Sequence, residues 1–287
     1  MTKVVFVYQP MVEGAKALAE ECARAAERRG LEPVFLSGWA LDSAAPLSGA
    51  AFAVTFGGDG TILRVARWVA GQDVRLIGVQ MGRLGFLAEL QPPEAPERLG
   101  DYFAGDYWVD QRAMLRADIV PSSLVGAGAS GGAIASDPTR QRSFLALNEI
   151  VVGRGRALRT VTVDLALNGE PLRRFRADGV IVATATGSTA YSFASGGAVL
   201  APGSGDLVVT PISPHLSTLR SFVVSGNAAV RLEVRSTDSP QLSVDGQLDL
   251  GLPDVEAVEA RVASAVTLFA RQGTPEALYR RILSKLG

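Results

Sequence analysis

The amino-terminal part of the chain alternates short apolar runs with segments of helical periodicity, and this alternation restricts the fold more than any other feature of the sequence. Continuous apolar strands separated by helices are typical of a parallel sheet that helices cover on both faces. The apolar runs lie at 4–7, 34–36, 51–56 and 75–79, and the helical segments lie at 12–29, 62–69 and 93–103. We therefore predict an α/β nucleotide-binding domain over residues 1–107.

The periodicity changes after about residue 108. Large apolar residues alternate with polar or small ones in 161–167 and 230–235, and Asn168-Gly169 is a pair typical of a hairpin turn. Such alternation indicates sheets with one face open to solvent. Helical periodicity returns only at 275–286. We predict a β-rich domain over 108–273 and a carboxy-terminal helix within 274–287 that packs on the first domain.

Residues 57–61, Gly-Gly-Asp-Gly-Thr, follow an apolar run and precede a helical segment. Asp-Gly is a common turn pair and glycine tolerates positive φ, so a simple turn is the alternative interpretation. The position between the carboxyl end of a strand and the amino end of a helix favours phosphate binding, because unobstructed backbone N–H groups can approach phosphate oxygens. Asp59 is the carboxylate best placed for chemistry there. Its predicted role is to accept a proton from an attacking hydroxyl.

No P-loop lysine completes this glycine loop. The chain has no Gly-Lys-Ser or Gly-Lys-Thr tripeptide, and of its 28 basic residues only Lys3, Lys16 and Lys285 are lysines, none of them near a glycine-rich loop in the sequence. We expect backbone amides, arginine and a divalent cation carried with the nucleotide to meet the phosphate charge. Mg²⁺ prefers few protein carboxylates together with substrate phosphates, so we predict Mg²⁺ without assigning a metal-ligating residue.

Residues 178–197 form a second constellation. An apolar run at 180–183 leads into a stretch of small, hydroxylated and glycine residues around Tyr191. A Ser/Thr-rich loop is the alternative interpretation. Small residues let a flat ligand approach the backbone, hydroxyls satisfy its polar edges, and a tyrosine ring offers a face for stacking. The stretch therefore predicts a ligand pocket.

Three shorter pieces carry weaker signals. They are Asn148-Glu149 within an apolar run, Arg176 with Asp178 at the start of a strand, and Asp245-Gly246-Gln247. A strand cap or a turn would explain each of them by itself. These short pieces indicate a binding site only when they are considered together with the two longer motifs.

Two further features argue against other chemistries. His215, the only histidine, has no cysteine or histidine neighbours, which argues against a metal site or an imidazole-activated nucleophile. Gly126-x-Gly128-x-x-Gly131 matches the dinucleotide fingerprint only in form, because no strand pattern precedes it and no helix pattern follows it.

The composition of the chain indicates which partners and which cellular compartment to expect. A net charge of −1 over 287 residues gives no field that would attract nucleic acid or an acidic membrane, so we expect neither as a partner. The one cysteine, Cys22, excludes an internal disulfide and fits a reducing compartment. The first apolar run ends at Pro10 and is too short for a signal peptide or a membrane span. We expect a cytoplasmic protein.

Taken in order, these motifs resemble those of the NAD kinase family, whose members phosphorylate the 2′-hydroxyl of the adenosine ribose of NAD to give NADP. The Gly-Gly-Asp-Gly-Thr loop alone also occurs in diacylglycerol and sphingosine kinases, and phosphofructokinase carries a similar loop. The Thr-Gly-Ser-Thr-Ala-Tyr-Ser stretch at 186–192 is more specific. The matching stretches are 57–61, 82–87, 147–149, 178–197, 211–215 and 245–247.

The resemblance implies a phosphofructokinase-like α/β domain followed by a β-rich NAD-binding domain, with NAD between them. Carried over by motif, Asp59 is the proton acceptor, and Asn148 and Glu149 hold ribose or adenine groups. Arg176 and Asp178 approach the nicotinamide half. The other implied contacts are Gly57, Gly58, Gly60, Thr61, Arg159, Thr189, Ala190, Tyr191, Ser192, Phe193, Ala194 and Gln247.

The resemblance also implies the reaction partners and the assembly. It implies ATP or polyphosphate as the phosphoryl donor and a homo-oligomer, a dimer or a tetramer built from dimers, in which a neighbouring subunit completes the site. Two alternatives stay open. One is a lipid kinase that shares the glycine loop, and the other is a nucleotide-sensing protein that binds NAD or NADP without turnover.

The chain departs from the family pattern in two places. Ala185 stands where family members often have proline, which loosens the turn entropically without removing a group that contacts a ligand. The Gly-, Ala- and Ser-rich stretch at 122–137 is longer than the pattern requires, and we interpret it as a mobile loop.

Overall fold

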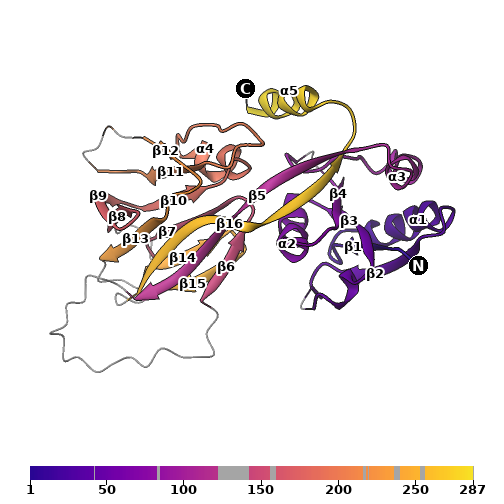
Figure 1. Ribbon diagram of the computed structural model, residues 1–287, viewed down its shortest axis with the longest axis horizontal. Coiled ribbons are helices and arrows are strands. Elements are labelled where there is room, and N and C mark those ends of the chain that lie inside the picture. Colours follow the sequence, from indigo (N-terminus) through magenta and orange to yellow (C-terminus); the bar gives the residue numbers. More distant parts are fainter. Residues whose placement is uncertain are drawn as a thin grey trace. The chain divides into compact units, whose positions relative to one another are not determined.

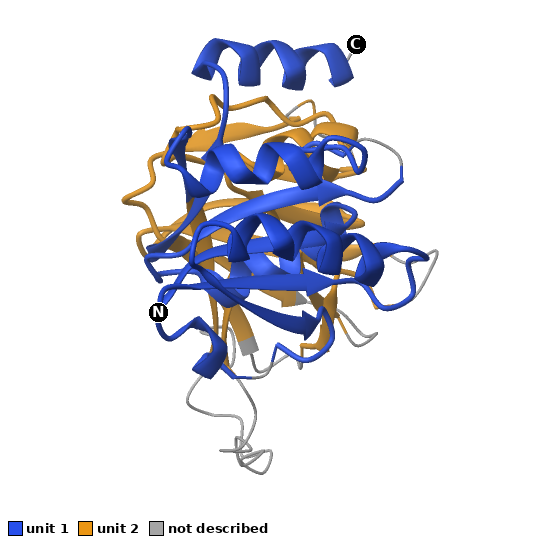
Figure 2. Cartoon of the chain, turned by 90° about the vertical axis from the view of Figure 1, so that its right-hand side faces the viewer, with its two compact units in different colours: residues 1–112, 264–287 blue, residues 113–263 orange. Residues whose placement is uncertain are grey.

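The computed structural model describes residues 1–41, 43–82, 85–121, 142–155, 160–215, 218, 220–235, 240–252 and 256–286 (Figure 1). The chain divides into two compact units, which comprise residues 1–112 with 264–287 (unit 1) and residues 113–263 (unit 2) (Figure 2). The stretch at 122–137 and Arg159 lie outside the described residues.

Two long strands, β5 (Trp108–Pro121) and β16 (Glu256–Arg271), contribute residues to both units. The division therefore falls within them, after Arg112 and after Ala263, whereas the sequence placed it at 107 and 273. A composition-based boundary cannot find such a division, because the alternating pattern of a strand continues across it.

Unit 1 contains a parallel sheet of strand order β2-β1-β3-β4, and the last part of β16 pairs in parallel with β4 through Leu268 and Phe269. The parallel pairing confirms the sheet that the continuous apolar runs predicted. The other elements of this unit are β1 (Lys3–Tyr8), α1 (Ala15–Glu27), β2 (Glu32–Ser37), η1 (Ala45–Leu47), β3 (Ala50–Gly57), α2 (Asp59–Val69), β4 (Arg75–Gln80), α3 (Ala95–Phe103) and α5 (Pro275–Leu286).

Helices cover both faces of this sheet. Residues of α1 and α3 share one buried cluster with Phe6, Phe56 and Ile77, which lie on one face. Gly78 faces the opposite side, since neighbouring strand residues alternate, and a Cβ built on it would lie 2.7 Å from Cδ1 of Ile62 in α2. The absence of a side chain at Gly78 thus lets α2 pack closely on β4, and the glycine loop lies between the carboxyl end of β3 and the start of α2.

The carboxy-terminal helix α5 has the bounds that its periodicity predicted, Pro275–Leu286. Leu278 and Ile282 on one side of the helix are buried. Arg281 forms an ion pair of 3.0 Å with Glu89, so α5 contacts the segment that follows β4 within unit 1. No helix in the described ranges is long and apolar enough to cross a membrane.

Unit 2 contains two antiparallel sheets. One has the strand order β12-β11-β10-β7-β14-β15, and the other joins the first part of β16 to β13, β8 and β9, with β5 pairing with β16 and β6. Their bounds are β6 (Ser143–Ala146), β7 (Glu149–Gly153), β8 (Val161–Leu167), β9 (Glu170–Ala177), β10 (Gly179–Ala183), β11 (Leu207–Ile212), β12 (Phe222–Val224), β13 (Val230–Arg235), β14 (Gln241–Val244) and β15 (Leu248–Gly251).

One apolar core lies between these sheets. It includes Val163 and Leu232 from one sheet and Ile150, Val182 and Val209 from the other. β8 and β13 have the bounds predicted from their alternation, 161–167 and 230–235. The predicted hairpin is confirmed as well, since Asn168 and Gly169 between β8 and β9 have φ values of 52° and 87°, as a two-residue type I′ turn requires.

Candidate functional site

The glycine loop forms the junction between β3, which ends at Gly57, and α2, which begins at Asp59. Positive φ values occur at several other glycines but not at those of this loop, so turn conformation alone does not account for them. Gly57 is needed for packing, because a Cβ there would lie 2.3 Å from Oγ1 of the buried Thr61. Gly58 is extended, with φ −93° and ψ −175°, and Gly60 is exposed.

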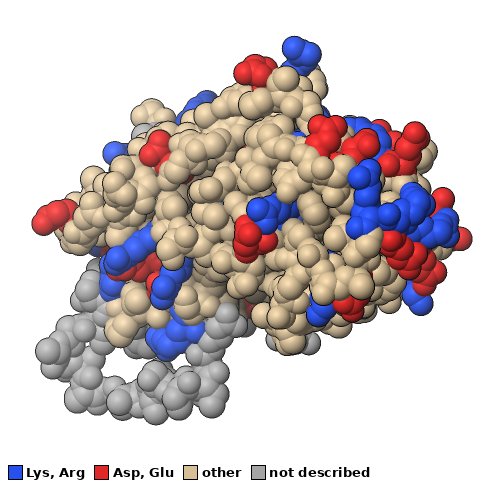
Figure 3. All heavy atoms as spheres, turned by 45° about the vertical axis from the view of Figure 1, so that its right-hand side comes forward, with Lys and Arg blue, Asp and Glu red and all other residues tan. Residues whose placement is uncertain are grey.

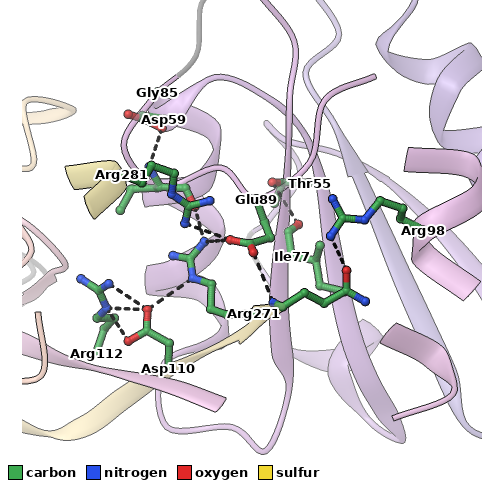
Figure 4. Close-up of polar contacts among 12 residues, drawn as sticks. Thr55, Asp59, Ile77, Gly85, Glu89, Arg98, Asp110, Arg112, Arg271 and Arg281 are labelled. Carbon is green, nitrogen blue, oxygen red and sulfur yellow. Dashed lines mark hydrogen bonds and ion pairs between the residues drawn. The ribbon is translucent and has the colours of Figure 1, made fainter. Parts of the chain in front are cut away.

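Backbone amides hold the Asp59 side chain (Figure 4). Its carboxylate accepts hydrogen bonds from the N–H groups of Phe86 at 2.8 Å and Leu87 at 3.2 Å. Gly85 allows this approach, since a Cβ on it would lie 2.1 Å from Oδ1 of Asp59. Asp59 also occupies the first turn of α2, where the helix dipole favours negative charge. The carboxylate is thus fixed in direction where β3 ends and α2 begins.

A chain of buried charges lies behind the segment that holds Asp59 (Figure 4). Arg271, which is 2% exposed, pairs with Glu89 at 2.8 Å and with Asp110 at 3.3 Å. Asp110 pairs in turn with the buried Arg112 at 2.8 Å, and Arg281 adds a second cation at Glu89. Burial on this scale is tolerated because each charge has partners, so the loss of one member would leave an uncompensated charge. The sequence analysis did not identify this cluster.

In unit 2, the side chain of Asp245 binds backbone N–H groups, as that of Asp59 does in unit 1. Its carboxylate accepts hydrogen bonds from the N–H groups of Leu147 at 3.1 Å, Asn148 at 2.8 Å and Glu149 at 3.2 Å. Asp245 and Gly246 have φ values of 51° and 61°, which confirms the turn. The turn nevertheless does more than reverse the chain, because its carboxylate fixes the backbone that presents Asn148 and Glu149.

Glu149 is buried at 6% exposure, and its Oε2 has no hydrogen-bond partner within the described residues. Burial, as the larger cause, and the nearby negative charge of Asp245 together raise the pKa of its carboxyl group to about 8. At neutral pH the side chain is therefore a carboxylic acid that can donate a hydrogen bond. Such a group suits a ligand oxygen better than a ligand N–H.

Replacing Glu149 with glutamine is expected to raise the melting temperature increasingly between about pH 5 and pH 8. The folded wild type keeps its proton up to about pH 8, whereas the unfolded chain releases it near 4.5. Wild-type stability therefore falls with rising pH across this window, at a limiting slope of about 1.4 kcal/mol per pH unit, and Glu149→Gln removes that loss. Thermal unfolding at several pH values measures the difference, with Glu97→Gln on the exposed side of α3 as control. A difference between Glu149→Gln and wild type that stays constant from pH 5 to pH 8 would contradict the assignment.

The small-residue stretch after β10 satisfies much of its own backbone. Thr184 Oγ1 donates to Leu147 O at 2.5 Å and accepts from the N–H groups of Thr186 and Gly187. Gly187 lies against Asn148, since a Cβ on it would be 2.1 Å from the Asn148 carbonyl oxygen. The composition of this stretch predicted hydroxyls that meet a ligand, but the hydroxyl of the buried Thr184 binds the backbone of Leu147, next to Asn148.

The predicted contacts from Thr189 to Ala194 form the end of η2 (Gly187–Thr189) and the short helix α4 (Tyr191–Ala194). Tyr191 and Phe193 are 47% and 39% exposed, whereas Ser192 is buried and its Oγ lies 2.9 Å from Oγ1 of Thr210. Thr189 and Ala190 are partly buried and Ala194 is exposed. A hollow of about 770 Å³ in unit 2 is lined by Tyr191, Ala194, Ser195, Gly196, Pro211, Ile212, Ser213, Pro214, Thr218 and Arg220. An exposed tyrosine at its edge is consistent with a stacking surface.

Arg176 and Asp178, which were predicted near the nicotinamide half, bind different partners. Asp178 pairs with Arg154 at 3.1 Å, and Nε of Arg176 donates to Thr160 Oγ1 at 3.2 Å. Gln247 is half-buried in the Asp245 turn, where its N–H donates to Val244 O at 3.0 Å.

Charges on the face shown in Figure 3 are mixed, with Lys and Arg side chains interspersed among Asp and Glu. Among the described residues, no group of three or more His, Cys, Asp and Glu side chains is placed to hold a metal ion.

Comparisons with known proteins give one consistent family. The sequence model of the ATP-NAD kinase N-terminal domain matches residues 40–107, and that of the C-terminal domain matches residues 147–271. An NAD kinase of Dehalococcoides mccartyi is 34% identical over 285 residues, which cover 99% of this chain and 95% of that protein. An NAD kinase of Chloroflexus aurantiacus is 32% identical over 287 residues, which cover 100% of this chain and 99% of that protein.

Two solved structures share the fold. The crystal structure of yeast NADH kinase complexed with NADH matches with a TM-score of 0.80 at 21% identity and covers 100% of this chain and 88% of that one. The crystal structure of an NAD kinase from Archaeoglobus fulgidus in complex with ATP matches with a TM-score of 0.76 at 24% identity and covers 99% of each chain. These likenesses confirm the predicted fold class, an α/β part followed by a β-rich part.

Proposed function

This chain belongs to the NAD kinase family and phosphorylates NAD to NADP, and we propose that Asp59 accepts the proton of the attacking 2′-hydroxyl of the adenosine ribose. The observation that carries the role of Asp59 is its fixed carboxylate, held by two backbone amides at the first turn of α2. The lipid kinase alternative is not supported, because the two matching domain models and the relatives described above are NAD kinases.

In the proposed reaction the 2′-oxygen of the ribose attacks the terminal phosphorus of the donor, and the bond from that phosphorus to the leaving phosphate oxygen breaks. The hydroxyl proton passes to the Asp59 carboxylate. The loose transition state needs alignment and charge stabilisation more than strong bases, so the orientation of Asp59 matters as much as its basicity. The amides of Phe86 and Leu87 supply that orientation.

We propose that the glycine loop binds donor phosphates, with Gly57, Gly58, Gly60 and Thr61 lying at the junction of β3 and α2, where the helix dipole favours negative charge. A divalent cation, for which Mg²⁺ is the expected ion, enters with these phosphates and supplies charge neutralisation. Mg²⁺ commonly keeps several water ligands and binds through substrate phosphates, so we assign it no protein ligand. No step assigned to the residues of this chain depends on the identity of the ion.

We propose that unit 2 binds the dinucleotide. Asn148 and Glu149, fixed by Asp245, hold ribose or adenine groups, and the exposed ring of Tyr191 stacks on a flat ring of the ligand. Arg176, Asp178 and Gln247 are proposed further contacts, as are Arg159 and the α4 residues. A homo-oligomer and a cytoplasmic location remain predictions.

The direct test uses purified full-length protein with NAD, a phosphoryl donor and Mg²⁺, and detects NADP with an NADP-specific dehydrogenase. We expect NADP to form with ATP or polyphosphate and not without a donor. Parallel reactions with NADH establish the preferred acceptor, and size-exclusion chromatography with light scattering establishes the assembly. Tight NAD or NADP binding without product from any donor would instead identify a nucleotide sensor.

A further inference from the structure

The segment from Gly85 to Glu89, which holds Asp59, is itself anchored along its length. Leu87 O accepts a hydrogen bond from Nη1 of Arg271 at 2.8 Å, and the N–H of Glu89 donates to Gly78 O at 2.8 Å. The Glu89 carboxylate pairs with Arg271 and Arg281 and accepts from the N–H of Gln272 at 3.2 Å. The far end of the segment is thus firmly tied to β16 and α5.

The near end of the segment is held by the last turn of α5. Lys285, one turn after Arg281, donates from Nζ to the carbonyl oxygen of Gly85, and its Nζ lies 5.3 Å from the centre of the Phe86 ring. The side chain is partly buried, and burial lowers the pKa of its ammonium group, with the positive charge of Arg281 acting in the same direction. Placing a cation here therefore costs free energy, and the contacts of Lys285 with Gly85 and Phe86 offset part of that cost.

One peptide group connects Lys285 with Asp59. The carbonyl oxygen of Gly85 and the N–H of Phe86 belong to the same planar amide, and Lys285 binds the first while Asp59 accepts from the second. A cation on the carbonyl oxygen polarises the amide and strengthens the hydrogen bond that its N–H donates. It also fixes the direction in which that N–H points.

We propose that Lys285 is a positioning residue for Asp59, acting through the Gly85–Phe86 peptide to hold and stabilise the ionised carboxylate that receives the substrate proton. This inference rests on the proposed role of Asp59. The carboxy-terminal helix then belongs to the catalytic machinery of unit 1, although no residue of it touches substrate in this proposal.

Among the described residues, the charged groups that pair with one another around this segment are Arg281 of α5, Arg271 of β16, Glu89 and Asp110 of β5. A change at Lys285 leaves their charges in place. A shift in the pH dependence of Lys285→Met therefore reports on Lys285 and the group it acts on.

The test compares pH profiles of kcat/KM for wild type, Lys285→Met, Lys285→Arg and the control Lys16→Met, which removes an exposed lysine of α1. Lys285→Met is expected to lower kcat roughly tenfold and to move the acidic limb upward by about half a pH unit or more, because the ionised carboxylate loses hydrogen-bond support. The KM for NAD should change little. Lys285→Arg should restore most of the limb position, and Lys16→Met should match wild type.

Profiles of Lys285→Met and wild type that superimpose would overturn the proposal, and so would an equal loss in Lys285→Met and Lys285→Arg with no shift of the limb. Far-UV circular dichroism and melting curves establish that α5 stays folded. The proposed function is tested separately by Asp59→Asn. If that variant loses turnover while Lys285→Met behaves as wild type, the role of Asp59 stands and the role of Lys285 fails.

Discussion

Asp59→Asn is expected to lower kcat by roughly 10²- to 10⁴-fold, the range that a positioned general base contributes. An amide has nearly the shape of a carboxylate but cannot take a proton at neutral pH. The two amides of Phe86 and Leu87 that hold Asp59 come from a segment anchored elsewhere, so the fold around it should persist. Steady-state kinetics with ATP, Mg²⁺ and NAD, coupled to an NADP-specific dehydrogenase, measure the effect.

The matched control is Asp101→Asn, which makes the same chemical change at an exposed position of α3 in unit 1. It should keep wild-type kinetics. Calorimetric titration should show NAD binding to Asp59→Asn within a few-fold of wild type, because Asp59 is proposed to meet only the 2′-hydroxyl and the other proposed dinucleotide contacts lie in unit 2. Near-normal turnover in Asp59→Asn with intact NAD binding would mean that another group takes the proton.

Local patterns account for what the sequence predicted correctly. Continuous apolar runs at 4–7 and 51–56 mark strands of a sheet covered on both faces, and β1 and β3 contain them. Alternation fixed both ends of β8 and β13, and the Asn168-Gly169 turn needs only its two residues. Each of these signals depends on a few neighbours in the chain. Strand pairing across a long connection carries no such signal, so no local pattern shows that β5 and β16 contribute residues to both units.

The residues that hold Asp59 in place could not be predicted from the sequence. The motif that follows β4 was visible, but no local pattern showed that Phe86 and Leu87 donate to a carboxylate 27 and 28 residues earlier. The charged cluster joins Glu89, Asp110 and Arg271, which have no shared periodicity. Lys285 lies near no glycine-rich loop along the chain, yet it contacts Gly85 across 200 residues. Contacts at such separations are set by the whole fold.

The partners of the polar side chains in the 184–192 stretch could not be predicted from the sequence. The sequence indicated a compact, ligand-sized environment, but composition cannot distinguish a hydroxyl that meets a ligand from one that meets the protein's own backbone. Thr184 and Ser192 turned out to be buried with protein partners, whereas Tyr191 is exposed. A glycine in this stretch can mark a close contact between two backbone segments, as Gly187 does against Asn148.

Gly187→Ala is expected to destabilise unit 2 by about 3 kcal/mol and to weaken NAD binding at least about tenfold. The added Cβ would lie 2.1 Å from the carbonyl oxygen and 2.4 Å from the carbonyl carbon of Asn148. Those atoms belong to a backbone that Asp245 and Thr184 hold in place, so neither side of the contact can move aside cheaply. Relief of the clash must displace Asn148 and Glu149, the residues proposed to hold ribose or adenine groups.

Gly203→Ala is the matched control, because a Cβ at Gly203 meets no atom within 4 Å and its φ is not in the positive range. It should melt within a degree or so of wild type, whereas Gly187→Ala should melt about 6 to 12 °C lower. Differential scanning fluorimetry with and without NAD measures both effects, since a ligand stabilises only the state that binds it. Should Gly187→Ala melt and bind NAD as Gly203→Ala does, the close contact between η2 and the Asn148 segment would not constrain the site, and the placement of Asn148 and Glu149 as ligand-holding residues would lose its physical basis.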